Sequence, residues 1–434
     1  MTADLILESI RTRTARAGVI GLGYVGLPLL IEFAKAGFDV LGFDVDQARV
    51  DAIGRGESYL EDVAADDIRK VIAGGRLRTT TGFDELSNLD TVNICVPTPL
   101  RKTKDPDLSF VVAAVDEIAR HLRPGQLIIL ESTTYPGTVE EVVKPKLEAT
   151  GLLVGQDFFL AFSPERVDPG NLEWPTSRIP KVVGGIDEDS TRVATALYEQ
   201  IIEKVVPVSS ARVAEMVKLL ENTFRAVNIG LANEFALMCR DLDVDVWEVI
   251  EAAETKPFGF MPFYPGPGLG GHCVPIDPFY LSWKARQVGF ESRFIELAGH
   301  INGGMPRHVV QQISDALNSR SRSINGSIVH LFGVAYKPGV SDTRESPALD
   351  ILKLLLERGA VVRYTDPFVE VVTAGDVKLE AMTLEEALAG GIDCAVITTA
   401  HAQIDYAEIA RRVPVVVDTR NALKRVKAGH VFRL

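Results

Sequence analysis

One cysteine in a glycine- and proline-rich segment is the side chain of this sequence best suited to covalent chemistry. Cys273 stands in GGHCVPID (residues 270–277), directly after PGPG (residues 265–268). This composition is too rich in glycine and proline for a helix or a central strand, so we predict a loop. A thiolate on a loop is a competent nucleophile, and Asp277 stands four residues on as a candidate general base. A single cysteine is more often a small buried apolar residue, which is the interpretation we keep for the other three: Cys95, Cys239 and Cys394.

A second candidate site is the glycine motif GLGYVG (residues 21–26) near the N-terminus. The six-residue match alone is a weak signal, but it lies between a predicted strand at 17–20 and a predicted helix at 27–36. Glycines there permit a tight turn and bring backbone amides close to a pyrophosphate at the positive end of the helix. Asp44 closes the next predicted strand, 39–43, where a carboxylate accepts hydrogen bonds from the adenosine ribose and repels the extra phosphate of NADP. We therefore predict NAD as the cofactor, bound by Gly21, Gly23, Tyr24, Val25, Gly26 and Asp44.

The composition is that of a globular protein with more than one domain. The 434 residues are too many for one core, and 46% hydrophobic with 24% charged residues is typical of globular domains. The longest apolar stretch, 17–31, is shorter than a membrane span and is broken by glycines and Pro28, so we expect no membrane association. The net charge of −13 argues against nucleic acid as a partner, because binding a phosphate backbone needs a basic face.

Cysteine spacing and the first residues of the sequence indicate a compartment. The four cysteines stand at wide, irregular intervals that form neither a metal motif nor a disulfide framework. The N-terminal residues lack the apolar core of a secretory signal. We therefore expect a cytoplasmic protein with no metal site.

The order of predicted elements indicates two α/β domains around a helical segment. Strands and helices alternate from residue 17 to about 205, with further strands at 90–96, 127–130, 158–162 and 182–183. Helical periodicity then runs through 211–241, 245–253, 278–288 and 306–317. A second alternating unit has strands at 328–332, 361–364, 395–398 and 415–417, with a helix from Ser346-Pro347 to Arg358. We predict an α/β fold class: two Rossmann-like doubly wound domains, 1–207 and 319–434, joined by an all-helical central segment, 208–318, whose long helix could pair with another copy.

Four segments carry a resemblance to a known family. They are SPER (163–166), AEMVKLLENTF (214–224), KPFGFMPFYPGPG (256–268) and GPGLGGHCVPIDPFYLSWKA (266–285). With the glycine motif, they make the chain resemble the UDP-sugar 6-dehydrogenases, NAD-dependent enzymes that turn a nucleotide sugar into its uronic acid. The resemblance covers nearly the whole chain in family order. The cysteine loop looks like that of the UDP-N-acetylhexosamine branch, because the glucose branch tends to carry Phe-Gly-Gly-Ser-Cys and a lysine before the aspartate, where this chain has His272 and Ile276.

The resemblance implies a double oxidation of the sugar C6 alcohol without release of the aldehyde. Cys273 attacks the aldehyde to give a thiohemiacetal, which is oxidised to a thioester and cleaved by water. Lys218 and Asn222 stand four residues apart, hence on one face of the long helix, where they can stabilise the alkoxide. The family match also gives roles to a water-holding carboxylate, a glutamate of thioester hydrolysis and a water-holding threonine: Asp277, Glu165 and Thr133.

The resemblance further implies the residues that hold the two ligands. Pro97, Thr98, Thr133 and Arg344 join the glycine motif at the cofactor. The nucleotide sugar is assigned to Glu165, Arg166, Val167, Lys218, Asn222, Lys256, Phe263, Tyr264, Gly270, His272, Lys337 and Arg420. Lys256 matches a basic position that the family donates across a dimer interface, so we expect a homodimer or higher homo-oligomer.

Two positions depart from simple expectations. Where the glucose branch has a second glutamate four residues after Glu165, this chain has Pro169, so a two-carboxylate hydrolysis scheme lacks one partner. No second histidine or cysteine stands at ligand spacing from His272, so a role in shaping the loop or contacting the acetamido group is favoured over zinc.

The favoured interpretation is a UDP-N-acetylglucosamine 6-dehydrogenase that makes a uronic-acid precursor of a surface polysaccharide. UDP-N-acetylmannosamine is the nearest competing substrate, and UDP-glucose and GDP-mannose fit the loop less well. A sugar epimerase that retains NAD, or a non-catalytic nucleotide-sugar sensor, are alternatives of other classes. A sensor would need none of Cys273, Lys218, Asn222 and Asp277.

Overall fold

The computed structural model describes residues 3–60, 63–101, 105–167, 174–271, 273–375, 377–426 and 428–434. Its contacts divide the chain into two compact units. The N-terminal unit holds Met1–Glu221 and Phe279–Gly289, and the C-terminal unit holds Asn222–Pro278 and Phe290–Leu434. The three-segment division at 207 and 318 stays a prediction.

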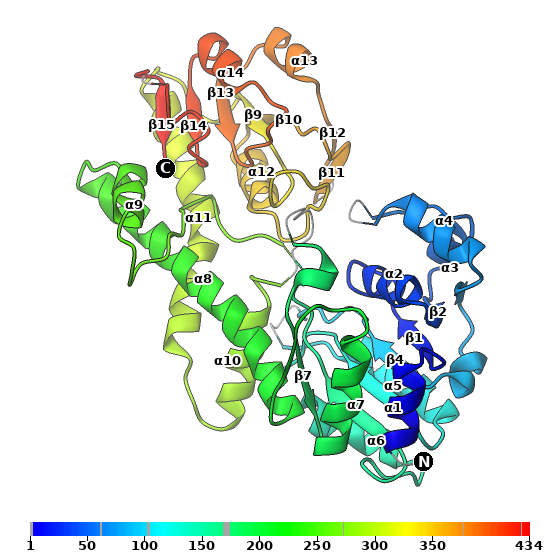
Figure 1. The fold of residues 1–434 in the computed structure, drawn as a ribbon. Helices are drawn as coiled ribbons and strands as arrows, with labels where there is room; N and C mark the ends of the chain where they lie inside the picture. The colour runs from blue at the N-terminus through cyan, green and yellow to red at the C-terminus, as the bar shows by residue number, and fades with distance from the viewer. Residues whose placement is uncertain are drawn as a thin grey trace. The chain divides into compact units, whose positions relative to one another are not determined.

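The N-terminal unit is built on an eight-stranded sheet with the order β3-β2-β1-β4-β5-β6-β7-β8. Its strands are β1 (Arg16–Ile20), β2 (Asp39–Phe43), β3 (Leu77–Thr80), β4 (Thr91–Ile94), β5 (Leu127–Leu130), β6 (Phe159–Phe162), β7 (Lys181–Gly185) and β8 (Val205–Pro207). Figure 1 labels β1, β2, β4 and β7 of this sheet. In this order, the six strands from β3 across to β6, with β2 and β1 among them, are parallel. Strand β7 is antiparallel to β6, and β8 is parallel to β7. The order reverses between β1 and β4, which is the switch point where such sheets bind ligands.

Helices cover both faces of this sheet. They are α1 (Ala3–Arg11), α2 (Gly26–Ala36), α3 (Gln47–Gly54), α4 (Ala65–Ala73), α5 (Ser109–His121), α6 (Lys144–Glu148) and α7 (Glu188–Tyr198), with short helical turns at Asp84–Asn88, Val139–Val143 and Thr176–Arg178. Alternate residues of each strand enter different cores: Leu127 and Ile129 pack with α1, α2 and α7, and Ile128 and Leu130 pack on the other face. Both faces of the sheet are buried, which explains why its strands are continuously apolar.

The C-terminal unit contains a five-stranded parallel sheet with the order β10-β9-β13-β14-β15. Its strands are β9 (Ile328–Phe332), β10 (Val361–Thr365), β13 (Cys394–Ile397), β14 (Val416–Asp418) and β15 (Val431–Arg433), and β11 (Val371–Ala374) pairs with β12 (Val377–Glu380) as an antiparallel hairpin. Helices of this unit are α9 (Val246–Glu254), α11 (Arg293–Asn318), α12 (Pro347–Glu357), α13 (Leu384–Ala389) and α14 (Tyr406–Arg412). The predicted α/β class with two doubly wound sheets and a helical segment between them is confirmed.

Two helices pass from one unit to the other along the chain: α8 (Ala211–Asp241) and α10 (Asp277–Gln287). Helix α8 has the predicted bounds. Within the C-terminal unit it packs on α11, because Gly230 lets the helices approach until an added Cβ would lie 3.1 Å from the Cβ of Ala298. Asn302 of α11 joins them further, donating to the carbonyl of Ala226 at 3.0 Å and accepting from Asn233 at 2.8 Å.

The predicted start of one helix at Pro306 is wrong. Helix α11 begins at Arg293 and carries Pro306 in its interior. Proline is favoured in the first turn of a helix, which is why the sequence suggested a start there. In the interior it removes one backbone hydrogen bond, a loss that burial of its neighbours Met305, Val309 and Val310 offsets.

Candidate active site

The loop after β1 fits a dinucleotide through its glycines. Gly21 has φ +92°, and a Cβ there would lie 2.6 Å from the carbonyl oxygen of Cys95. A Cβ on Gly26 would lie 1.8 Å from the carbonyl oxygen of Gly21, so only glycine lets α2 start this close to the loop. Among the described residues, no atom beyond the chain neighbours of Gly23 lies within 4 Å of a Cβ added there, which leaves space for a pyrophosphate. The first turn of α2 holds no acidic residue, and its N-cap is Val25, so its positive end suits an anion.

Asp44 follows β2 and is tied to the glycine loop. Its buried carboxylate accepts from the amide of Leu22 at 2.8 Å and from that of Asp46 at 3.0 Å. Arg49 lies 3.4 Å from the same carboxylate. These contacts use part of its accepting capacity and leave lone pairs for ribose hydroxyls.

The loops after β4 and β5 supply the next predicted cofactor contacts. Pro97 is exposed and Thr98 is buried, with the carbonyl of Thr98 accepting from the hydroxyl of Tyr280 at 2.9 Å. The hydroxyl of Ser132, after β5, donates to the carbonyl of Val96 at 2.7 Å, so the two loops are held together. Thr133 is the next residue and is half-buried. All these strand ends lie at the carboxyl edge of the sheet, together with the glycine loop.

Glu165, after β6, lies in a buried charged cluster that sequence reasoning missed. Lys181 of β7 is 2.6 Å from the carboxylate of Glu131 and 3.2 Å from that of Glu165. Burial alone would raise the pKa of Glu165, but the ammonium of Lys181 and the amide of Val167 hold that pKa below its usual value. A lysine inside the apolar run IPKVVGG (179–185) and a glutamate directly after an apolar strand were the signals available.

The part of α8 in the N-terminal unit carries two more buried polar side chains. Lys218 is buried, as predicted for a residue of the site. Glu215, one turn earlier and not predicted, accepts from the amides of Gly137 at 2.5 Å and Val139 at 3.0 Å. Burial raises the pKa of Glu215 to about 7, against the lowering effect of those amides. Arg166 forms an ion pair with Glu221, also on α8, at 2.7 Å.

In the C-terminal unit, Cys273 lies in a turn that leads into α10. Its carbonyl accepts from the amides of Ile276 at 3.0 Å and Asp277 at 2.8 Å. The thiol-bearing residue is half-buried, whereas Cys95, Cys239 and Cys394 are buried. The predicted loop position of Cys273 is confirmed.

Asn222 and Asp277 are brought together in the same unit. The Nδ2 of Asn222 donates to Oδ2 of Asp277 at 2.5 Å, and both side chains are buried. Asp277 is the first residue of α10, where a carboxylate also suits the helix dipole. One amide and one carboxylate are thus set beside the turn of Cys273.

The carboxyl ends of the second sheet carry the predicted cationic residues. Lys337 follows β9, and its ammonium lies 5.8 Å from the ring centre of Tyr336. Arg420 follows β14 and is half-buried; its Nε donates to the carbonyl of Thr398 at 2.9 Å. Burial lowers the pKa of Arg420 to about 10. A Cβ on Gly266 would lie 2.5 Å from Nη1 of Arg420, so the PGPG segment lies directly against this guanidinium.

The remaining predicted residues of the C-terminal unit surround the glycine-rich segment. The amide of Gly271 donates to the carbonyl of Arg344 at 3.1 Å, and Arg344 pairs with Asp342 at 2.6 Å. A Cβ on Gly270 would lie 2.8 Å from that of Tyr336. On the neighbouring loop, the other predicted residues make ring contacts: Phe263 with Phe224, Tyr264 with Trp247, and exposed Lys256 with Phe258.

The predicted site residues are therefore divided between the two units. The N-terminal unit holds the glycine loop, Asp44, Thr98, Thr133 and Glu165 to Val167, with Lys218. The C-terminal unit holds Asn222, the Cys273 turn, Arg344, Lys337 and Arg420. His272 and Pro169 lie outside the described residues.

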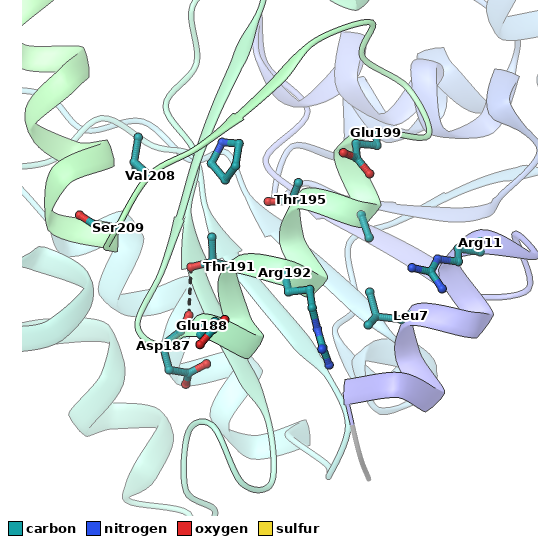
Figure 2. Close-up of a pocket in the computed structure, with 12 residues that line it drawn as sticks. Leu7, Arg11, Asp187, Glu188, Thr191, Arg192, Thr195, Glu199, Val208 and Ser209 are labelled. Carbon is teal, nitrogen blue, oxygen red and sulfur yellow. Dashed lines mark hydrogen bonds between the residues drawn. The ribbon is translucent and has the colours of Figure 1, made fainter.

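A hollow of about 530 Å³ lies elsewhere on the N-terminal unit, between α1, α7 and the residues after β8 (Figure 2). Arg11, Arg192 and Glu199 line it together with Pro207 to Ser209. Because β7 and β8 run against β6, the end of β8 lies at the sheet edge opposite to the glycine loop. This hollow is therefore separate from the candidate site.

No helix among the described residues is both long and apolar enough to span a membrane. No three histidine, cysteine, aspartate or glutamate side chains among them form a group that could hold a metal ion.

Comparison with known proteins identifies the family. The UDP-glucose/GDP-mannose dehydrogenase family matches through its NAD binding domain at residues 15–202, its central domain at 212–303 and its UDP binding domain at 330–425. The UDP-N-acetyl-D-mannosamine dehydrogenase of Pyrococcus horikoshii is 36% identical over 96% of this chain and 98% of its own length. The UDP-N-acetyl-D-glucosamine 6-dehydrogenase of Pseudomonas aeruginosa is 37% identical over 83% of this chain and 84% of its own. A solved structure of the UDP-D-ManNAc dehydrogenase from Pyrococcus horikoshii matches with a TM-score of 0.88 at 35% identity, over 96% of this chain and 98% of that one.

The chain belongs to the UDP-glucose/GDP-mannose dehydrogenase family. Within that class it is an NAD-dependent UDP-sugar dehydrogenase. The predictions of the family and of NAD as the cofactor are confirmed, and NAD fits the glycine loop and Asp44 described above.

Proposed function

We propose that this chain oxidises the C6 hydroxyl of a UDP-N-acetylhexosamine to the carboxylate. The observation that carries the proposal is the half-buried Cys273 turn at the start of α10, beside the buried pair of Asn222 and Asp277. A thiol, an amide donor and a carboxylate are the groups that a covalent double oxidation needs. The relative at 36% identity is named a UDP-N-acetyl-D-mannosamine dehydrogenase and the one at 37% a UDP-N-acetyl-D-glucosamine 6-dehydrogenase. We keep UDP-N-acetylglucosamine as the favoured substrate and UDP-N-acetylmannosamine as the second.

The chemistry proposed for the chain's own residues has three parts. Lys218 and Asn222 stabilise the alkoxide that forms when the C6 hydroxyl loses its proton to solvent, and this alkoxide would give its hydride to bound NAD to become the aldehyde. The thiolate of Cys273 adds to the aldehyde carbon. The resulting thiohemiacetal would lose its hydroxyl proton to solvent and a second hydride to a second NAD, bound after the first NADH has left, giving a thioester. Asp277 takes a proton from the water that cleaves the C–S bond, which returns the thiol and releases the uronic acid.

Binding of the nucleotide is proposed for the cationic residues at the second sheet. Arg420 is half-buried against the PGPG segment and has the carbonyl of Thr398 as its hydrogen-bond acceptor, so a diphosphate would supply the missing negative charge. Lys337 adds a point charge from the loop after β9, which is separated from β14 by β13 in the sheet. The UDP end is thereby assigned to the C-terminal unit.

We also propose a homodimer formed through α8. An exposed apolar stripe (the α8 stripe) repeats at intervals of three, four or seven residues along this helix and the residue after its end: Val213, Met216, Leu220, Phe224, Leu231, Phe235, Met238 and Leu242. Residues at this spacing lie on one face of a helix, and a second copy is the partner that would cover such a face symmetrically.

A substrate panel tests the proposed function. Purified protein with NAD is offered UDP-N-acetylglucosamine, UDP-N-acetylmannosamine, UDP-glucose and GDP-mannose while NADH absorbance is followed. We expect a preference for the UDP-N-acetylhexosamines and two NADH for each sugar consumed. An interconversion of sugars without net NADH would instead identify an epimerase, and no turnover with any of the four would contradict the proposal.

A further inference from the structure

A buried carboxylate on α8 joins this helix to the loop that carries Thr133. Glu215 is 1% exposed, and its two oxygens accept from different backbone amides. Oε2 accepts from the amide of Gly137 at 2.5 Å, and Oε1 accepts from that of Val139 at 3.0 Å. A buried carboxylate is costly to desolvate, and the proposed reaction gives it no role, so its retention needs an explanation.

The loop of Thr133 is held at both of its ends. At its start, the hydroxyl of Ser132 donates to the carbonyl of Val96 at 2.7 Å, which ties it to the loop after β4. At its end, Gly137 has φ +101° and donates its amide hydrogen to Glu215. Thr133 therefore lies between one anchor at the sheet and one anchor on α8.

The α8 end of this link lies one turn from Lys218. Glu215 and Lys218 are three residues apart and both buried, so their side chains lie on the same face of the helix. The helix itself is fixed in this unit, because Ala211 and Ala214 of its first turn are buried in the core. The place of the Thr133 loop relative to Lys218 therefore depends on the two amides that Glu215 binds.

We propose that Glu215 is a positioning residue whose carboxylate holds the loop after β5 against α8, so that Thr133 keeps a fixed place relative to Lys218 during the reaction. This inference rests on the proposed function and on the water-holding role that the resemblance implies for Thr133. A carboxylate suits this place because both of its oxygens accept. The amide of a glutamine would turn an NH₂ group toward one of the two backbone N–H groups.

Other charged groups of the same elements lie closer to solvent. Arg212 of α8 pairs with Glu140, and their side chains are 52% and 37% exposed. Lys284 of α10 pairs with Glu141 at 2.6 Å, with side chains 19% and 44% exposed. Exposed pairs of this kind contribute little. Burial raises the pKa of Glu215 to about 7 against the lowering effect of its two amides, so the bonds that hold the loop also favour the ionised carboxylate.

Glu215→Gln tests the link with a side chain of nearly the same size. Glu140→Gln is the matched control, because Glu140 joins the same two elements through its surface pair with Arg212. NADH formation is measured with saturating NAD and the preferred UDP-sugar. We expect kcat to fall about ten- to a hundredfold in Glu215→Gln, the cost of a small misplacement, with the KM for the sugar within about threefold of the parent. A parent-like kcat in Glu215→Gln, or an equal loss in the control, would overturn the proposal.

A double-variant cycle shows whether Glu215 acts through Thr133. Thr133→Val removes the hydroxyl and keeps the branched shape of the side chain. Once that hydroxyl is gone, loosening its loop has little further effect, so the variant with both changes should turn over about as fast as Thr133→Val alone. If the two losses instead multiply, Glu215 acts elsewhere and the assignment is wrong.

Glu215→Asp keeps the test decisive even if Glu215→Gln does not fold. Aspartate retains the negative charge beside the two amides but is one methylene shorter, so it cannot hold them where glutamate does. A role confined to charge predicts a parent-like kcat. Our proposal expects kcat to be lower by at least about fivefold in protein that still unfolds cooperatively, and a parent-like value would contradict it.

Hydrogen exchange without ligand distinguishes failure of this inference from failure of the proposed function. The amides of Gly137 and Val139 should exchange at least about tenfold faster in Glu215→Gln than in the parent and in Glu140→Gln. Unchanged exchange would contradict the link itself, whatever the parent's activity. Faster exchange with a parent-like kcat would contradict the positioning role alone. A parent that is inactive on every UDP-sugar would contradict the proposed function instead.

Discussion

At the scale of residues, the three glycines of the loop after β1 have different physical reasons to be there. Gly21 has a positive φ, which favours glycine. Gly26 must lack a side chain because its backbone lies directly against the carbonyl of Gly21. Gly23 has neither requirement from the protein itself, because the space around an added Cβ is open. Its small size therefore serves the cofactor, and the other two serve the fold as well.

Two alanine substitutions separate these roles. Gly26→Ala places a methyl group 1.8 Å from a backbone oxygen, so we expect a loss of about 3 kcal/mol or more in the free energy of unfolding. Gly23→Ala should change that free energy by less than about 0.5 kcal/mol yet weaken NAD binding about tenfold, the effect of one displaced charge-assisted hydrogen bond. Denaturant unfolding and NAD titration measure the two effects. If Gly23→Ala binds NAD as the parent does, the pyrophosphate does not lie where we assign it.

Two aspartates at matching places explain why only one of the two sheets suits NAD. Asp44 follows β2 and retains accepting capacity. Asp366 follows β10, and its oxygens accept from the amides of Val334, Ala335, Phe368 and Val369, while His401 lies 3.1 Å away. These partners together outweigh burial and lower the pKa of Asp366. A carboxylate used this fully by its own unit has little left for a ribose.

At the scale of elements, α8 shows what sequence periodicity predicts well. Its 31 residues carry no proline, and both the predicted bounds and the observed ones are Ala211–Asp241. The α8 stripe gathers large apolar side chains of this helix that the chain itself leaves exposed. A long helix with such a face is stabilised when a partner buries it.

Charge placed on the α8 stripe should break the proposed dimer. Phe235→Glu and Leu231→Glu, at positions 41% and 50% exposed, are expected to shift the protein from dimer to monomer at micromolar concentration in sedimentation velocity. Val371→Glu, on a hairpin strand and 44% exposed, is the control that should leave the assembly unchanged. An unaltered sedimentation coefficient in the two stripe variants would place the interface elsewhere.

The features that the sequence did not predict each have a physical reason. Proline is common in the first turn of a helix, so Pro306 suggests a helix start there and the first half of α11 is not predicted. Strand β7 reads like its parallel neighbours, because strand direction leaves no mark in an apolar run, yet it is antiparallel to β6. The glycine loop, Asp44 and the Cys273 turn were predictable because their chemistry is local in sequence. The partners Glu131 and Lys181 stand fifty residues apart and meet only through the sheet.

At the scale of the whole molecule, the residues assigned to the proposed reaction belong to both units of the chain. The N-terminal unit carries the glycine loop and Lys218, and the C-terminal unit carries Cys273, Asp277 and Arg420. Helix α8 runs through the boundary, with Lys218 and Asn222 one turn apart on either side of it. In a chain with a net charge of −13, the few cations assigned to the substrate must create a local positive site for an anionic ligand.

The most direct measurement of the central claim is the mass of enzyme stopped during turnover. Asp277→Asn should slow the final hydrolysis, so acid quenching after mixing with NAD and the preferred UDP-sugar is expected to show the nucleotide sugar on the peptide that contains Cys273. Cys273→Ser should show no adduct and lose at least about a thousandfold of sustained turnover, while it binds NAD as the parent does. Uronic acid formed by Cys273→Ser at near the parent rate, or an Asp277→Asn enzyme that never carries sugar at residue 273, would contradict the account.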